Sequence, residues 1–391
     1  MKSALEGTTV VELADYITGP YATMLLADMG ARVIKLEAPG RGDPFRLWEE
    51  GGYSSIFCTF NRGKESITLD LNVAEAREVA QALVKRADVF LENHRPGVSE
   101  RLGLGYEQLR QLNPSLVYCS ISGFGQDGPY RDRPGYDTIG QAMGGVLSLL
   151  TDWDEPKGMG ISLSDHLGGL FAAYGILGAL VAREKSGIGQ KVDTSLLQAT
   201  VAFLDESAGR YFKTGEVPNR ESRARISHVY AFVAADRLPF VVHLSSPQKF
   251  FQGLAKVIGR PELTTDPRFA ERKARIEHHH ELSAILAEIF LQKPRSTWLR
   301  LLEEQGVPSS PLNNLEEVFN DPQVRHLGME VKVRHPERGD MRLVGSAIRL
   351  SATPIVIEKP PPVLGEHTEA LLKQLGYDEK AVSRLREVGA I

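Results

Sequence analysis

The sequence predicts an α/β protein that has a Rossmann-like large domain and a smaller α+β domain. Three observations predict it: β-rich runs alternate with stretches of helical periodicity, short glycine-containing connections join them, and the length suits two or three domains. The chain has 391 residues, against a prior of roughly 150 residues per domain. Strands that alternate with helices favour a parallel sheet, whose ligands bind near the carboxyl ends of the strands.

The first βαβ unit comes at the start of the chain. "TTVVELA" (8–14) and "ARVIKLEA" (31–38) are rich in β-branched residues, and "GPYATMLLADMG" (19–30) between them has apolar spacing that suits a helix. The alternation continues with the strand "SITLDL" (66–71) and the amphipathic helix "NVAEAREVAQALVKR" (72–86). Next come the strands "ADVFLEN" (87–93) and "SLVYCSISGFG" (115–125), with the helical "YEQLRQLNP" (106–114) between them.

A long apolar helix is predicted over residues 165–184. Its run "LGGLFAAYGILGALVA" (167–182) has 16 apolar or small residues, short of the roughly 20 that a membrane-spanning helix needs. We therefore expect burial inside the protein and no membrane partner. Residues 189–212 then predict a strand followed by one helix.

The polar break "TGEVPNRESRARISH" (214–228) suggests a domain boundary. Beyond it, residues 228–245 contain β-like runs, while 247–259 and 281–305 have helical periodicity. The charged helix "GEHTEALLKQLG" (365–376) is expected to return to the first domain. The predicted organisation is an N-terminal part of the large domain (1–200), a linker (201–225), a small α+β domain (226–315), a second linker (316–335) and a C-terminal part of the large domain (336–391).

Composition excludes several classes of protein. The net charge of −4 gives no general attraction to nucleic acid, although a local basic pocket remains compatible with it. Cys58 and Cys119 are the only cysteines, too few for a disulfide framework and without metal-ligand spacing. The adjacent histidines of "EHHHE" (277–281) point in different directions on a helix, so no metal site is predicted. The first residues lack a secretory signal, and we expect a cytoplasmic enzyme.

The segment "GISLSDHLGG" (160–169) places Asp165 at the start of the long helix. Ser162 or Ser164 is a candidate N-cap, with Asp165 in the first turn, where unpaired N–H groups favour negative charge. A purely structural role at the helix start is the ordinary explanation for such a residue. Gly168 and Gly169 remove bulk beside the carboxylate, which would suit either a bulky substrate or close helix packing.

A resemblance to a known family extends over nearly the whole chain. "DHLGGLFAAYGILGALVAREKSGIGQKVDTSLLQA" resembles the segment that holds the catalytic aspartate in class III CoA-transferases, the CaiB/BaiF family. "LEGTTVVELADYITGPYATMLLADMGARVIKLEAPGRGDPFR", "FNRGKESITLDL", "ENHRPGVSERLGLGYEQLRQLNPSLVYCSISGFGQDGPY" and "PPVLGEHTEALLKQLGY" are similar to other family segments. Each fragment is modest alone, but their order and spacing together are specific.

The resemblance implies an acyl-CoA:carboxylate CoA-transferase in which Asp165 is the nucleophile. Asp165 attacks an acyl-CoA thioester to give an aspartyl anhydride and CoA thiolate, which then forms an aspartyl-CoA thioester and releases the donor acid. An incoming carboxylate removes CoA through a second anhydride, so that one difficult exchange is divided into easier steps. The glycines and nearby backbone N–H groups are candidate oxyanion donors.

Coenzyme A also needs cations or N–H donors for its phosphates. Lys35, Arg41, Arg46, Lys64, Arg95 and Arg101 lie in or beside the family-like segments near predicted strand ends. Among these we favour Arg41, Lys64 and Arg101 as phosphate ligands, because arginine offers a planar fork of donors and lysine a compact charge.

The resemblance implies four further CoA contacts. Asn93 and His94 occupy positions that contact CoA in similar transferases, although His94 departs from the aromatic residue of some relatives. Ile17 and Thr18 are similar to residues that line the thiol end of CoA. An isolated histidine also has the ordinary explanation of local hydrogen bonding.

Two other activities have specific sequence signals. "GFGQDG" (123–128) matches G-x-G-x-x-G after a strand, but the prolines that follow favour a loop over the helix that a dinucleotide-dependent oxidoreductase needs. Tyr136 stands in "GYD", where related 2-methylacyl-CoA racemases carry a catalytic histidine in "GHD". A tyrosine with a pKa near 10 is a poor acid–base group at neutral pH, so transfer is favoured over racemisation, and Tyr136 is expected at the CoA site.

The acyl groups are less defined by the sequence. "HLSSPQKF" (243–250) lacks the glycine-rich tetrad of the oxalate-related branch, which disfavours formyl-CoA and oxalate. Succinyl-CoA or another dicarboxylyl-CoA is the expected donor, with Arg46 or Arg131 as the cation for its distal carboxylate. We expect no tightly bound cofactor, since the CoA thioester is a substrate. The resemblance further implies an interlocked homodimer.

Overall fold

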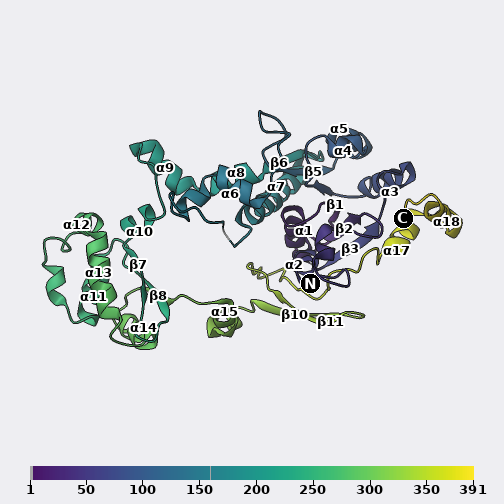
Figure 1. The fold of residues 1–391 in the computed structure, drawn as a ribbon. Helices are drawn as coiled ribbons and strands as arrows, with labels where there is room; N and C mark the ends of the chain where they lie inside the picture. The colour runs from purple at the N-terminus through teal and green to yellow at the C-terminus, as the bar shows by residue number, and fades with distance from the viewer. Residues whose placement is uncertain (1–2, 159) are drawn as a thin grey trace. The chain divides into compact units, whose positions relative to one another are not determined.

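The computed structural model describes residues 3–158 and 160–391, which form two compact units (Figure 1). The first contains residues up to 147, most of 158–206 and residues 325–391. The second contains residues 148–157 and 207–324. The second unit thus takes in residues 148–157, 207–225 and 316–324, which the sequence-based division places outside the small domain.

A six-stranded parallel sheet organises the first unit, with the order β3-β2-β1-β4-β5-β6. The strands are β1 (Thr9–Leu13), β2 (Arg32–Glu37), β3 (Lys64–Thr68), β4 (Val89–Glu92), β5 (Val117–Ser122) and β6 (Lys191–Ser195). This is the order of a doubly wound Rossmann-type sheet. The predicted α/β class is confirmed, because every strand expected between residues 8 and 125 is present.

Helices cover both faces of this sheet. One face packs against α3 (Ala74–Val84), α5 (Tyr106–Leu112), α17 (Thr368–Leu375) and α18 (Glu379–Glu387), and the other against α1 (Thr18–Asp28) and α7 (Leu163–Ser186). Alternate residues of β1 supply the two cores: Val11 and Leu13 face the first set of helices, and Val10 faces the second. Burial on both faces explains the largely apolar sequences of β1 (TVVEL) and β4 (VFLE).

The remaining elements of the first unit are shorter. They are α2 (Ser55–Asn61), α4 (Val98–Arg101), α6 (Asp137–Met143), α8 (Leu196–Phe203), the 3-10 helix at Pro44–Trp48, and the antiparallel hairpin of β10 (Glu330–His335) and β11 (Gly339–Val344). The C-terminal segment is joined to β3, since the N–H of His367 donates to the Ser66 carbonyl at 2.9 Å.

The second unit has its own core beneath a three-stranded antiparallel sheet. Its strands are β7 (Val229–Val233), β8 (Pro239–His243) and β9 (Ser309–Pro311). Its helices are α10 (Ser222–Ser227), α11 (Gln248–Val257), α12 (Arg272–Glu277), α13 (His279–Phe290), α14 (Arg295–Glu304) and α15 (Leu315–Asn320), with a 3-10 helix at Pro261–Thr264. The boundaries between the two units along the chain fall inside α9 (Asp205–Thr214) and α16 (Pro322–His326).

Three elements differ from the sequence-based expectation. The segment 189–212 forms β6 and two helices, α8 and α9, where one helix was predicted. Pro294 separates α13 from α14, because proline cannot continue a helix. α7 has 24 residues, and by length and composition alone it could cross a membrane, but one side of it packs into the core of the first unit.

Candidate functional site

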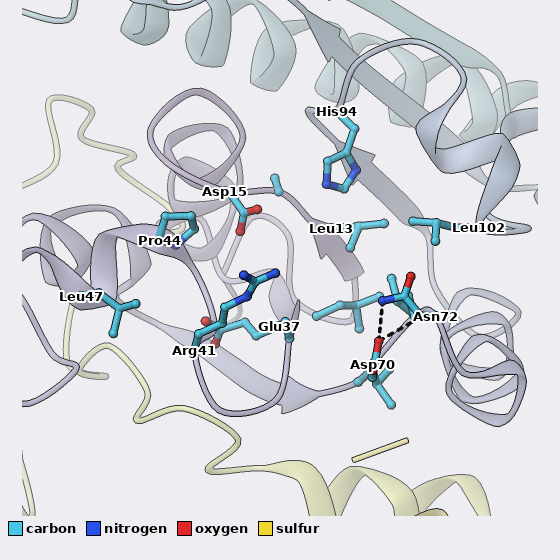
Figure 2. A pocket seen from close by; sticks show the side chains of 16 residues that line it. Leu13, Asp15, Glu37, Arg41, Pro44, Leu47, Asp70, Asn72, His94 and Leu102 are labelled. Carbon is cyan, nitrogen blue, oxygen red and sulfur yellow. Dashed lines mark hydrogen bonds between the residues drawn. The ribbon is translucent and has the colours of Figure 1, made fainter. Parts of the chain in front are cut away.

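Two adjoining cavities open at the carboxyl ends of the central strands. The strand order reverses between β1 and β4, which is where ligands bind in doubly wound sheets. The larger cavity has a volume of about 470 Å³ and the smaller about 210 Å³. Asp15, just after β1, and His94, just after β4, line both. Figure 2 shows these two side chains in the larger cavity, together with Arg41.

Asp165 lies in the first turn of α7 and lines the smaller cavity. The Thr18 hydroxyl donates a hydrogen bond of 2.5 Å to Asp165 Oδ1. The backbone N–H of Asp165 donates to Asp137 Oδ1 at 3.2 Å, whereas Ser162 makes no capping hydrogen bond with its side chain. A carboxylate from α6 therefore helps to cap α7, and the Asp165 side chain is not used for that purpose.

The electrostatic surroundings of Asp165 favour its protonated form more than water does. Burial raises the pKa of Asp165 to about 6, the charge of Asp137 acts in the same direction, and the hydrogen bond from Thr18 and the neighbouring imidazole of His166 oppose both. Among the described residues, no lysine or arginine contributes to the electrostatics of Asp165. At neutral pH it is thus an ionised carboxylate that no lysine or arginine neutralises, which suits a nucleophile.

Gly168 and Gly169 bring α7 close to α1. A Cβ atom at Gly169 would lie 2.6 Å from the Thr18 carbonyl oxygen, and one at Gly168 would lie 2.9 Å from Thr18 Cγ2. Both distances are too short for real contacts. The sequence left two explanations open for these glycines, and the structure supports close helix packing, which brings the Thr18 hydroxyl to Asp165.

Asn93 and His94 lie where β4 meets the loop after β1. Asn93 joins the two, because its amide donates to the Asp15 carbonyl at 2.7 Å and accepts from the Asp15 N–H at 3.0 Å. The backbone N–H of His94 donates to Glu92 at 2.8 Å. Burial lowers the pKa of His94 to about 4, with the charge of Lys35 acting the same way, so its imidazole is neutral at pH 7.

Of the other residues predicted near the thioester end of CoA, two line the smaller cavity and one does not. Thr18 and Tyr136 line the smaller cavity, and Tyr136 is 65% exposed. Ile17 precedes α1 and is buried in a cluster with Phe45 and Phe57, so it lines neither cavity.

Lys64 and Arg46 do not have the roles expected from the sequence, which were a phosphate ligand for Lys64 and a ligand of the substrate carboxylate for Arg46. Lys64 Nζ is fully buried, lies 2.8 Å from Glu12 and donates to Asn61 and to the Pro20 carbonyl. Arg46 is 1% exposed and makes a two-pronged ion pair with Glu37. Each cation is already satisfied by its neighbours and lines neither cavity, so neither is available to a phosphate or a substrate carboxylate.

The remaining basic candidates lie in different places. Arg41 is exposed and lines the larger cavity, whereas Arg131 lines the smaller one with Asp165. Arg101 is exposed at the end of α4 and lines neither cavity. Of the three favoured phosphate ligands, only Arg41 is thus placed in a cavity.

From the sequence, no role was assigned to three residues of the site. Asp15 joins the two cavities, and Tyr16 beside it has a backbone φ of 65°, which is rare outside glycine. Asp137 helps to cap α7. The first two follow directly after a predicted strand, a position that could have identified them, but the contact of Asp137 spans 28 residues and has no local signal.

Comparison with known proteins identifies the family. The model of CoA-transferase family III matches residues 5–368. The acetyl-CoA:oxalate CoA-transferase of Acetobacter aceti is 39% identical, with 97% of each chain covered. The human succinyl-CoA:glutarate CoA-transferase is 35% identical over 99% of this chain and 90% of its own.

A solved structure agrees with both relatives. A CaiB/BaiF family protein from Brucella suis superposes with a TM-score of 0.86 at 35% identity, covering 96% of this chain and all of that one. The family resemblance stated from the sequence is thus confirmed. This chain belongs to CoA-transferase family III and is a CoA-transferase.

Proposed function

We propose that Asp165 is the nucleophile that carries the acyl group and then CoA during transfer between carboxylic acids. One observation supports this most directly: Asp165 lines a cavity at the switch point of the sheet, with a hydroxyl donor but no lysine or arginine partner among the described residues. A carboxylate that served only to begin α7 would not need that cavity. Asp137 already accepts the hydrogen bond from the first turn.

The proposed reaction proceeds through three covalent species. An Asp165 oxygen attacks the thioester carbonyl, so that an anhydride forms and the carbon–sulfur bond breaks to release CoA thiolate. The thiolate attacks the Asp165 carbonyl carbon, which gives an aspartyl-CoA thioester and the free donor acid. The acceptor carboxylate attacks this thioester to form a second anhydride, and the thiolate then attacks the acceptor carbonyl, leaving Asp165 as the carboxylate.

The start of α1 supports the negative charge that develops in these steps. Thr18 at the start of α1 lines the same cavity as Asp165, whereas the first-turn N–H groups of Leu197 and Gln198 in α8 already donate to the Gly123 carbonyl and the Ser195 hydroxyl. Unpaired N–H groups in a first helical turn stabilise anions, and one well-placed donor contributes roughly 3 kcal/mol to a transition state. Gly168 and Gly169 pack against Thr18, so we assign this role to the start of α1.

The two cavities suggest a path for CoA. We assign the nucleotide end to the larger cavity, where Arg41 is available to a phosphate, and the thioester end to the smaller cavity. Asn93 fixes the loop between them, and His94 lines both. Tyr136 and Thr18 lie toward the thioester end.

For the donor we propose a dicarboxylyl-CoA, with succinyl-CoA as the first to test. The human relative is named for succinyl-CoA and glutarate, and the relative from Chloroflexus aurantiacus, 37% identical, for succinyl-CoA and D-citramalate. Oxalate should also be tested as an acceptor. The segment "HLSSPQKF" disfavours it, but the Acetobacter relative is named for oxalate.

A homodimer is part of the proposal. α7 and α8 carry apolar side chains on their outer sides: Tyr174 is 73% exposed, Val181 59% and Phe203 52%. Exposed apolar side chains that gather on one face of a protein mark sites of protein–protein contact. Sedimentation equilibrium is expected to give twice the chain mass of 43.1 kDa.

The test of the nucleophile is intact-mass analysis after incubation with acyl-CoAs. A CoA adduct that maps to Asp165, together with loss of the adduct and of exchange in Asp165→Asn, is the expected result. Circular dichroism and thermal unfolding check that the variant is folded. A folded Asp165→Asn enzyme that exchanges CoA at the normal rate would falsify the assignment.

A further inference from the structure

We infer that Arg131 binds the distal carboxylate of a dicarboxylyl group and thereby selects dicarboxylic over monocarboxylic substrates. The inference rests on the proposed function, since it places the acyl group in the cavity that holds Asp165. Arg131 lines that cavity, whereas Arg46, the other cation considered from the sequence, is buried against Glu37.

The guanidinium of Arg131 is held by the end of the sheet. Its Nε donates to the Gln126 carbonyl at 2.8 Å, and the Gln126 side-chain amide donates to Ser120 Oγ at 2.7 Å. Ser120 belongs to β5 and its hydroxyl donates to Glu92 at the end of β4. The chain of hydrogen bonds restricts the plane of the guanidinium before any ligand arrives, which lowers the entropy cost of binding.

The other two guanidinium nitrogens remain available. Among the described residues, the only ion pair of Arg131 is with Asp132, whose nearest oxygen is 3.7 Å from Nη1 and whose side chain is 84% exposed. Such an exposed, distant pair contributes little. With Nε bonded to a carbonyl, the two Nη atoms form an end-on fork, which matches the two oxygens of a carboxylate.

The lining of the cavity fits an acyl chain with a charged end. Ile121 and Leu196 supply apolar surface beside Asp165, and Arg131, Arg133 and Arg95 supply positive charge. Arg133 stacks on the Tyr130 ring at 3.9 Å, so it already has a partner. A short methylene chain against the apolar side chains, with its carboxylate at Arg131, would satisfy both parts of the lining.

The experiment compares two unreactive CoA thioethers by isothermal titration calorimetry. S-(3-carboxypropyl)-CoA carries the distal carboxylate, and S-butyl-CoA has the same chain length without it. The wild-type enzyme is expected to bind the charged thioether at least about 10-fold more tightly, as one charge-assisted hydrogen bond allows. Arg131→Gln is expected to remove this preference and to leave the affinity for S-butyl-CoA and free CoA within about threefold.

Two further variants control the measurement. Arg110→Gln removes an exposed arginine of α5, whose guanidinium is 3.6 Å from Glu107, and is expected to keep the preference. Arg131→Lys keeps the charge but loses the fork, so an intermediate preference is expected, and it replaces Arg131→Gln if the latter does not fold.

Two results would overturn the inference. In one, the preference for the charged thioether is absent from the wild type or persists in Arg131→Gln. In the other, Arg131→Gln weakens both thioethers and free CoA equally, which would make Arg131 a ligand of CoA itself. Because no turnover is needed, a failure of the Asp165 mechanism shows up separately, as an Asp165→Asn enzyme that still exchanges CoA.

Discussion

Two carboxylates in the first unit contact the same helix and have opposite electrostatic environments. Glu12 accepts a 2.5 Å hydrogen bond from Thr23 of α1, and Asp165 accepts one of the same length from Thr18. Glu12 also pairs with Lys35 and Lys64, each at 2.8 Å. Burial alone would raise the pKa of Glu12, but the two lysines bring it down to about 2.

The comparison separates a structural carboxylate from a reactive one. Glu12 is completely buried and shares its charge between two ammonium groups, so it is a weak base and has no contact with either cavity. Asp165 has a pKa of about 6 and lines a cavity. A threonine hydroxyl is thus common to both sites, and the presence or absence of lysines decides what each carboxylate can do.

The largest effect is expected for Asp165→Asn. Removal of the nucleophile should lower the rate of CoA exchange at least about 1000-fold. The free energy of unfolding, in contrast, should rise at neutral and higher pH. The folded pKa of Asp165 lies above the ordinary 3.8, so ionisation destabilises the fold increasingly between about pH 4 and pH 6, and fully above that.

Denaturant unfolding tests this second part. At pH 8 the asparagine variant should be more stable than the wild type by about 1–2 kcal/mol, and near pH 4 the two should coincide. A variant less stable than the wild type at pH 8 would contradict the assignment of an unneutralised carboxylate.

The matching change at the structural carboxylate, Glu12→Gln, is expected to have its main effect on stability. It leaves Lys35 and Lys64 buried without their shared anion, at a cost of about 3–5 kcal/mol. Since the pKa of Glu12 is lowered, this contribution is present above about pH 4.5 and is lost as the pH falls toward 2. Unfolding at pH 7 measures the loss, and an equally stable variant would show that the lysines find other partners.

Gly169→Ala tests the packing that supports Asp165. The new Cβ would meet the Thr18 carbonyl at 2.6 Å, so α7 and α1 must separate by several tenths of an ångström. We expect kcat to fall by about 10- to 100-fold through misplacement of Thr18 and Asp165, and stability to fall by about 1–3 kcal/mol. Gly209→Ala, in α9 with no atom within 4 Å of the new Cβ, is the control and should keep the wild-type kcat.

Periodicity was enough to predict the sheet and α7, because the strands are buried on both faces and the apolar run of the helix is long. Asp165 was predicted through the family resemblance together with its position at a helix start. Lys64 and Arg46 show the limit of this reasoning. A cation near a strand end has the same local sequence whether it faces a ligand or a buried glutamate, and only contacts distant in sequence, such as that between Lys64 and Glu12, decide which.

The smallest effect, and the most direct comparison of the two sites, is expected from Thr18→Val and Thr23→Val. The hydrogen bond from Thr18 lowers the pKa of Asp165, so its loss should move the midpoint of the pH profile of kcat/KM upward from about 6, by roughly half a pH unit, and reduce kcat/KM at pH 7 by only about 1.2-fold, since the carboxylate stays mostly ionised there. Thr23→Val should cost about 1–3 kcal/mol of stability and leave that midpoint unchanged, since the lysines still hold Glu12 ionised. If the midpoint moved equally in both variants, the pH profile would depend on the position of helix α1 and not on the hydrogen bond between Thr18 and Asp165.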